Sequence, residues 1–333
     1  MEISKWYSTI DMHSGGEPIR IITGGLPQMR GAVQRERAAD FMGHHDAVRR
    51  LLMAEPRGHL GMTGAIVTPP ASDDAHFGLL FMNNEGLAPI SGHSLVAVVT
   101  AWLETGQIAR EEAVSGIRID CEAGRVTAYA DYDGTEARSV TIEGIPSFVL
   151  AADVPVVVER RACTIDVAYS GAFYAVVDAA PFGGITTSIS EMQAWGSAIR
   201  QAVEAAVDVV HPDDESIKGL HGVFMYESAA SGSTEHAYRG MTIFADAQCD
   251  RSPGGTGACA HLAVLIARGE LMLGEEVTYE GITGAKARCS SFAKENDHRS
   301  SIVPRYTADA HLLGWMNFVL DPSDPLPQGF ILR

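Results

Sequence analysis

Two glycine-rich turns, each followed by an apolar run of helical length, constrain this chain more than any other feature. The turns are Ser91-Gly92-His93-Ser94 and Asp250-Arg251-Ser252-Pro253-Gly254-Gly255-Thr256-Gly257. The same spacing separates Ser91 from Gly106 and Gly254 from Gly269, so each run also ends at a glycine. Glycine commonly follows the last turn of a helix. The repeated pattern predicts a duplicated chain with one buried helix in each half.

The start of each predicted helix is suited to binding an anion. The first N–H groups of a helix have no acceptor within it, and the helix dipole adds positive charge there. If the two turns face each other, the N–H groups of Gly92, His93, Gly255 and Thr256 would line an anion pocket. We therefore expect a carboxylate ligand. For a lone motif of this kind, an ordinary helix start would be the simpler interpretation.

Composition excludes several classes of function. The net charge is −17, from 42 acidic and 25 basic residues, which argues against a nucleic-acid partner because that binding depends on cationic contacts. The five cysteines are widely spaced and form no CxxC pair, so we expect free thiols in the cytoplasm. No stretch approaches the roughly 20 apolar residues of a membrane span. The protein is expected to be soluble.

The chain repeats one order of elements. Strands and a peripheral helix, predicted at residues 35–54 in the first half, precede a strand that leads to each glycine-rich turn. The run after Ser91 is apolar on all sides, which indicates an enclosed helix. We divide the chain into residues 1–150, completed by about 310–333, and residues 151–309.

Several segments together resemble the proline racemase family, which includes 4-hydroxyproline 2-epimerases and trans-3-hydroxy-L-proline dehydratases. They are Asp250-Arg251-Ser252-Pro253, Gly255-Thr256-Gly257, Asn84-Glu85-Gly86, Gly92-His93, Asp11-Met12-His13-Ser14-Gly15-Gly16-Glu17-Pro18, Gly171-Ala172-Phe173-Tyr174, Asp324-Pro325 and Gly329-Phe330. The resemblance covers nearly the whole chain. It implies an α/β (α+β), diaminopimelate-epimerase-like fold, with two pseudo-symmetric halves that each wrap β structure around a central helix and an active site in the cleft between them.

The departures from the family pattern indicate which reaction to expect. In the family's racemases and epimerases a cysteine precedes Gly-His in the first motif and another precedes Gly-Thr-Gly in the second. Here these positions hold Ser91 and Gly254. Racemisation needs one acid–base group on each face of Cα, and glycine has none. Cys259 lies more than a turn further along the helix and is expected to pack in the core.

One base is enough for β-elimination, which matches the trans-3-hydroxy-L-proline dehydratase branch. In that substrate the Cα hydrogen and the 3-hydroxyl lie on the same ring face, so one group could take the proton and assist the leaving hydroxide. The product would be pyrroline-2-carboxylate. Ser91 is the candidate, with His93 and the helix N-terminus available to activate it. The simpler interpretation is that Ser91 only caps the helix.

The resemblance assigns further residues to the substrate. Asp250 would pair with the ring ammonium, although turn carboxylates are common. His13, Phe173 and Tyr174 are candidates for the pocket wall. No metal-ligand spacing or phosphate loop occurs, so we expect no metal and no cofactor. By analogy a homodimer is expected.

Two alternatives stay open at this point. A proline racemase or 4-hydroxyproline 2-epimerase would exchange the Cα proton with inversion. A non-catalytic imino-acid-binding protein would bind the same ligand without exchange, and the weak acid–base character of Ser91 and Gly254 favours it.

Overall fold

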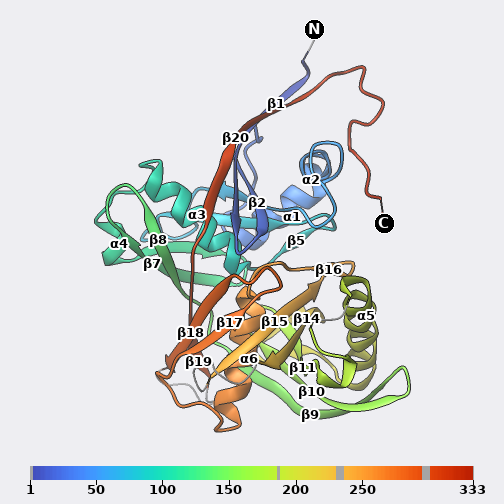
Figure 1. Ribbon diagram of the computed structural model, residues 1–333. Helices are drawn as coiled ribbons and strands as arrows, with labels where there is room; N and C mark the ends of the chain where they lie inside the picture. Colours follow the sequence, from blue (N-terminus) through green and yellow to red (C-terminus); the bar gives the residue numbers. More distant parts are fainter. Residues whose placement is uncertain (1–2, 186–187, 230–235, 295–300, 333) are drawn as a thin grey trace. The chain divides into compact units, whose positions relative to one another are not determined.

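A computed structural model describes residues 3–185, 188–229, 236–294 and 301–332 (Figure 1). The chain forms two compact units, Met1–Thr141 with Asp309–Arg333, and Ile142–Ala308. Residue 150, where the sequence analysis divides the chain, lies within a strand of the second unit. In the described ranges no helix is long and apolar enough to cross a membrane.

The described part of the first unit combines β-strands with four helices. Its strands are β1 (Lys5–Ser14), β2 (Glu17–Gly24), β3 (Thr63–Thr68), β4 (Phe77–Met82), β5 (Leu87–Ala88), β6 (Ile117–Cys121), β7 (Gly124–Tyr132), the start of β8 (Ala137–Glu143) and β20 (His311–Leu320). Its helices are α1 (Gln34–His44), α2 (Asp46–Met53), α3 (Gly92–Glu104) and α4 (Glu112–Ser115). The prediction of a single helix at residues 35–54 is therefore wrong. The helix is interrupted at His45, where φ is −129° and ψ is 6°.

The second unit repeats this plan. Its strands are β9 (Phe148–Val158), β10 (Arg161–Tyr169), β11 (Phe173–Asp178), β12 (Val210–His211), β13 (Asp214–Lys218), β14 (Leu220–Ser228), β15 (Ala237–Phe244), β16 (Gln248–Cys249), β17 (Val277–Glu280), β18 (Lys286–Ala293) and β19 (Ile302–Ala308). Its helices are the 3-10 turn η1 (Ala180–Phe182), α5 (Ile189–Ala206) and α6 (Gly255–Ala267).

Strand pairing confirms the duplication predicted from glycine spacing. In the first unit β20, β1, β2, β3, β4, β6 and β7 pair in that order, with parallel pairs only at β2–β3 and β4–β6. In the second unit β9, β10, β11, β14, β15, β17 and β18 pair in the same pattern, with parallel pairs at β11–β14 and β15–β17. Figure 1 shows β20 beside β1, although they come from opposite ends of the chain.

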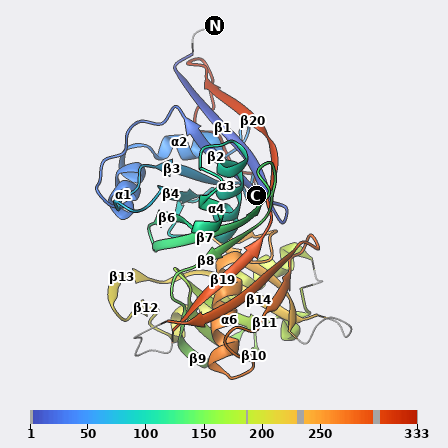
Figure 2. The same ribbon diagram turned by 90° about the vertical axis from the view of Figure 1, so that its left-hand side faces the viewer.

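The central helix of each unit is enclosed by strands. α3 contacts β1, β2, β3, β7 and β20, and α6 contacts β9, β10, β11, β14, β18 and β19 (Figure 2). Nearly every side chain of both helices is buried, in agreement with their all-round apolar sequences. Gly106 and Gly269 follow the two helix ends with φ of 70°, the left-handed conformation that glycine adopts without a Cβ clash. The expected two-half α/β fold is confirmed.

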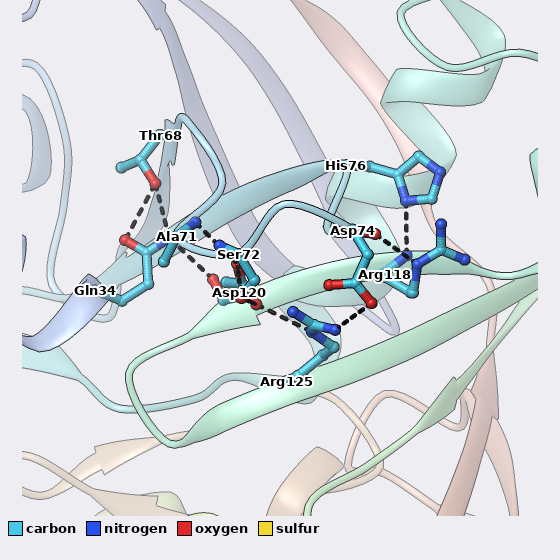
Figure 3. A network of polar contacts seen from close by, with 9 residues as sticks. All are labelled: Gln34, Thr68, Ala71, Ser72, Asp74, His76, Arg118, Asp120 and Arg125. Carbon is cyan, nitrogen blue, oxygen red and sulfur yellow. Dashed lines mark hydrogen bonds and ion pairs between the residues drawn. The ribbon is translucent and has the colours of Figure 1, made fainter. Parts of the chain in front are cut away.

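A polar network fixes the loop that leads into β4 (Figure 3). The Asp120 carboxylate on β6 is buried and accepts hydrogen bonds from the backbone N–H groups of Ala71 and Ser72, at 2.9 and 3.0 Å. Arg125 on β7 donates to Asp120 at 3.2 Å and to Asp74 at 2.7 Å. A buried carboxylate needs such partners to remain charged. The network therefore holds the loop before β4, the strand that leads to the first glycine-rich turn.

Candidate active site

Ser91 occupies the N-cap position of α3, but its side chain does not cap the helix. Its backbone is extended, with φ −148° and ψ 110°, and the hydroxyl makes no capping hydrogen bond. The Oγ atom instead lies 2.8 Å from Oγ of Ser94 and 3.2 Å from Nε2 of His93. An interpretation of Ser91 as a helix cap alone is therefore wrong.

The three side chains form a small cluster that can transfer a proton. His93 and Ser94 are 7% and 1% exposed, whereas Ser91 is half-buried. The Ser91 hydroxyl donates to Oγ of Ser94, and Nε2 of a neutral His93 imidazole lies close enough to take the same proton. The positive end of the α3 dipole stabilises negative charge on Ser91 Oγ. Ser91 thus has the two features that a serine base requires, an adjacent base and a positive field.

Ser94 is the member of this cluster that the sequence analysis missed. It is three residues after Ser91, within the first turn of α3. The side chains at the N-cap and three residues later commonly face each other at a helix start, so this spacing could have identified it.

In the second unit, Gly254 is the N-cap of α6 and has a left-handed backbone, with φ 107°. Gly255 and Thr256 begin the helix, and their N–H groups belong to its first turn. Thr256 is half-buried, and its Oγ1 lies 2.6 Å from the hydroxyl of Tyr174 on β11. Tyr174 is buried, and burial raises the pKa of its hydroxyl well above the usual value. A neutral Tyr174 therefore fixes the Thr256 side chain.

Asp250 follows β16 and is 4% exposed. Its Oδ1 accepts a hydrogen bond from the Ser252 N–H at 2.8 Å, and its own N–H donates to the Thr242 carbonyl at 2.9 Å. Oδ1 of Asp250 thus stabilises the turn, as a turn carboxylate commonly does. The carboxyl group is thus held in a buried position just before the start of α6.

The remaining pocket candidates have contrasting surroundings. His13, at the end of β1, is half-buried, with its ring 5.2 Å from that of His311. Burial, then the proximity of His311, lowers the pKa of His13 below its usual range. Phe173 is 1% exposed and packs 5.0 Å from the ring of Tyr169 in the core of the second unit. His13 is therefore only partly exposed, with Nδ1 accepting a hydrogen bond from the Gly16 N–H at 3.4 Å, whereas Phe173 supports the packing of the core.

The cysteines and the residue types that bind metals give no further site. All five cysteines are free thiols, and Cys259 is buried in α6 as expected. Across the described ranges, no group of three or more His, Cys, Asp or Glu side chains is arranged to hold a metal ion. Ser91, Gly92 and His93 belong to the first unit, whereas Asp250, Gly255 and Thr256 belong to the second.

Comparison with known proteins identifies close relatives. The profile of the family described as "Proline racemase" matches residues 9–331. A Bacillus cereus protein named trans-3-hydroxy-L-proline dehydratase is 44% identical over 100% of both chains. The proline racemase of Acetoanaerobium sticklandii is 34% identical over 99% of both. The crystal structure of a hydroxyproline epimerase from Agrobacterium vitis with bound trans-4-hydroxy-L-proline is 28% identical, with a TM-score of 0.89, covering 100% of this chain and 96% of the other.

Proposed function

The chain belongs to the proline racemase family, and we propose that within this family it is a trans-3-hydroxy-L-proline dehydratase. The reaction breaks the Cα–H bond and the C3–OH bond, forms a double bond between these carbons and releases water. The enamine then tautomerises to pyrroline-2-carboxylate. We propose that neither a metal nor an organic cofactor takes part.

The observation that carries this proposal is the contrast between the two turns. Ser91 has a hydroxyl in contact with His93 and Ser94, whereas the equivalent second position is Gly254, which has no side chain. Elimination needs one proton acceptor, and inversion at Cα needs a proton donor on the opposite face as well. Ser91 can supply the first requirement, and Gly254 cannot supply the second.

In the proposed mechanism, Ser91 takes the Cα proton and His93 takes the hydroxyl proton of Ser91. Because the Cα hydrogen and the 3-hydroxyl share a ring face, the same cluster then protonates the leaving hydroxide. The substrate carboxylate would bind the N–H groups of Gly92, His93, Gly255 and Thr256. Asp250 would accept a charge-assisted hydrogen bond from the ring ammonium.

The more similar of the two relatives supports the assignment as a dehydratase. The relative at 44% identity is named for the dehydratase, whereas the relative at 34% identity is named for proline racemase. A second candidate, 4-hydroxyproline 2-epimerase, is favoured by the structural likeness to an epimerase that binds trans-4-hydroxy-L-proline. The absence of a side chain at Gly254 counts against this candidate.

The test compares trans-3-hydroxy-L-proline, trans-4-hydroxy-L-proline and L-proline as substrates. The proposal predicts a pyrroline imine from the first and no inversion of the other two. Inversion of trans-4-hydroxy-L-proline without imine formation would support the epimerase instead. Ligand-dependent stabilisation with no product and no Cα exchange would identify a binding protein.

We also propose that the protein acts in the cytoplasm as a homodimer. The five free thiols suit a reducing compartment.

The homodimer is proposed from an exposed apolar surface. Leu313 and Trp315 on β20 are 57% and 65% exposed, and Trp6 on the paired strand β1 is 53% exposed. Apolar side chains gathered on one exposed ribbon are typical of an interaction surface. Sedimentation equilibrium of the intact protein and of a Trp315→Glu variant tests this, since the variant should dissociate.

A further inference from the structure

Phe224, on β14, lies against three glycines at the start of α6. It is fully buried. A Cβ atom placed on Gly240 would lie 2.6 Å from Cζ of the ring, and one on Gly257 would lie 2.9 Å from Cδ2. A Cβ on Gly254 would lie 2.5 Å from Cε2. Carbon atoms attract each other best at about 3.5–4.0 Å, so none of these positions accepts a side chain while the ring remains there.

The ring has little room to retreat. Gly240 on β15 and Gly257 on α6 lie so close that a Cβ on either would clash with it, and the ring centroids of His261 and Tyr279 lie 5.8 and 5.9 Å away. Packed interiors contain few voids into which a ring could move. The Phe224 ring therefore occupies the space that a side chain at Gly254 would need.

The backbone adds a second barrier at the same position. Gly254 has a φ of 107°, in the region that residues with a Cβ rarely adopt. Replacing Gly254 by a residue with an acid–base side chain would therefore not be enough to restore a base at this turn. A side chain at residue 254 requires both a strained backbone and displacement of Phe224.

Resting on the proposed dehydratase function, we propose that Phe224 is a specificity-determining residue that excludes an acid–base group from the second turn. With the ring in place, residue 254 offers no side chain that can donate a proton at the second turn. The deprotonated substrate then has one outcome, loss of the 3-hydroxyl. Phe224 acts by occupying space and does not itself transfer a proton.

Unfolding experiments test the steric part of the proposal without any substrate. Gly254→Ala should lower the denaturation midpoint more than Gly269→Ala, because Gly269 also has a positive φ, of 70°, but nothing within 4 Å of its Cβ position. Phe224→Leu removes the ring atoms nearest Gly254 and retains an apolar side chain. Adding Gly254→Ala to Phe224→Leu should cost less than adding it to the wild-type protein. Equal effects of Gly254→Ala in the two backgrounds would overturn the proposal.

Activity measurements test the consequence for the reaction. Gly254→Cys places a thiol where it could give one proton to Cα, with no oxidant or reductant required. We expect the fraction of substrate recovered with inverted Cα to stay at the wild-type level in Gly254→Cys and in Phe224→Leu. In the Gly254→Cys/Phe224→Leu double variant it should rise at least about tenfold.

Two results would contradict this role of Phe224. One is inversion by Gly254→Cys alone with an unchanged denaturation midpoint, since the ring would then exclude nothing. The other is a folded double variant whose introduced thiol reacts with iodoacetamide but which gives no inverted product. If the wild-type protein fails to dehydrate trans-3-hydroxy-L-proline, the proposed function fails, while the unfolding comparison still decides whether Phe224 excludes a side chain.

Discussion

The Oγ atom of Ser91 lies 3.2 Å from Nε2 of His93, although the two residues are separated by only one position in the chain. Side chains two apart on a regular helix do not face each other. Here they do because Ser91 is the N-cap, with an extended backbone that turns its side chain out of the helical pattern. This contact brings a base to a hydroxyl that would otherwise be a weak proton acceptor.

Ser91→Ala should abolish most activity without destabilising the protein. Loss of the proton acceptor should lower kcat by about 10²–10⁴-fold. The free energy of unfolding should change by no more than about 1 kcal/mol, because the Ser91 side chain makes no capping hydrogen bond and loses only its contacts with His93 and Ser94. Steady-state kinetics and urea denaturation measure the two effects. Ser94→Ala is the control, since it leaves the Ser91–His93 contact intact and should lower kcat less. Destabilisation of Ser91→Ala with near-normal kcat would indicate a structural serine.

His93→Gln should lower kcat by about 10²-fold with a smaller effect on KM. Glutamine can hydrogen-bond to Ser91 but cannot take its proton. The backbone N–H of residue 93, which we assign to the substrate carboxylate, is retained. Initial rates over a range of substrate concentrations separate the two constants. A rise in KM with unchanged kcat would show that the imidazole binds the substrate and does not activate Ser91.

Asp250→Asn should weaken substrate binding and preserve the fold. The amide oxygen can still accept the Ser252 N–H that Oδ1 accepts now. A charged hydrogen bond contributes about 1.5–3 kcal/mol, so KM should rise by about 10–100-fold. Pyrrole-2-carboxylate, which lacks the ammonium group, provides a matched ligand whose dissociation constant should change much less. Equal weakening for both ligands would mean that Asp250 does not pair with the amine.

His261 should make stability fall in acid. Burial, and then the charge of Arg268, lowers the pKa of His261 from 6.5 to about 3. The unfolded chain takes up this proton below pH 6.5 and the folded chain does not, so stability falls as the pH is lowered from 6.5 towards 3. Each pH unit in this window costs about 1.4 kcal/mol per such group. His261→Phe should reduce the slope of unfolding free energy against pH, measured by urea denaturation. An unchanged slope would contradict a buried neutral His261.

The sequence predicted the duplication because glycine marks chain reversals that other residues cannot adopt easily. Gly106 and Gly269 both have left-handed backbones after their helices, so their equal spacing from the two turns reflects real structural equivalence. The Ser91–His93 contact could not be predicted, since it depends on the backbone angles of one capping residue. The break at His45 was missed because the apolar spacing continues across it. The exclusion of a side chain at Gly254 depends on Phe224, which is distant in sequence and carries no motif.

The most direct test of one-base elimination is partial conversion of trans-3-hydroxy-L-proline in D₂O, followed by analysis of product and recovered substrate. The account predicts pyrroline-2-carboxylate carrying deuterium at C3, because the enamine takes a solvent deuteron there when it tautomerises. Recovered substrate should keep its configuration at Cα, since Gly254 has no side chain that could return a proton. Recovery of cis-3-hydroxy-D-proline deuterated at Cα, with little or no pyrroline product, would contradict it.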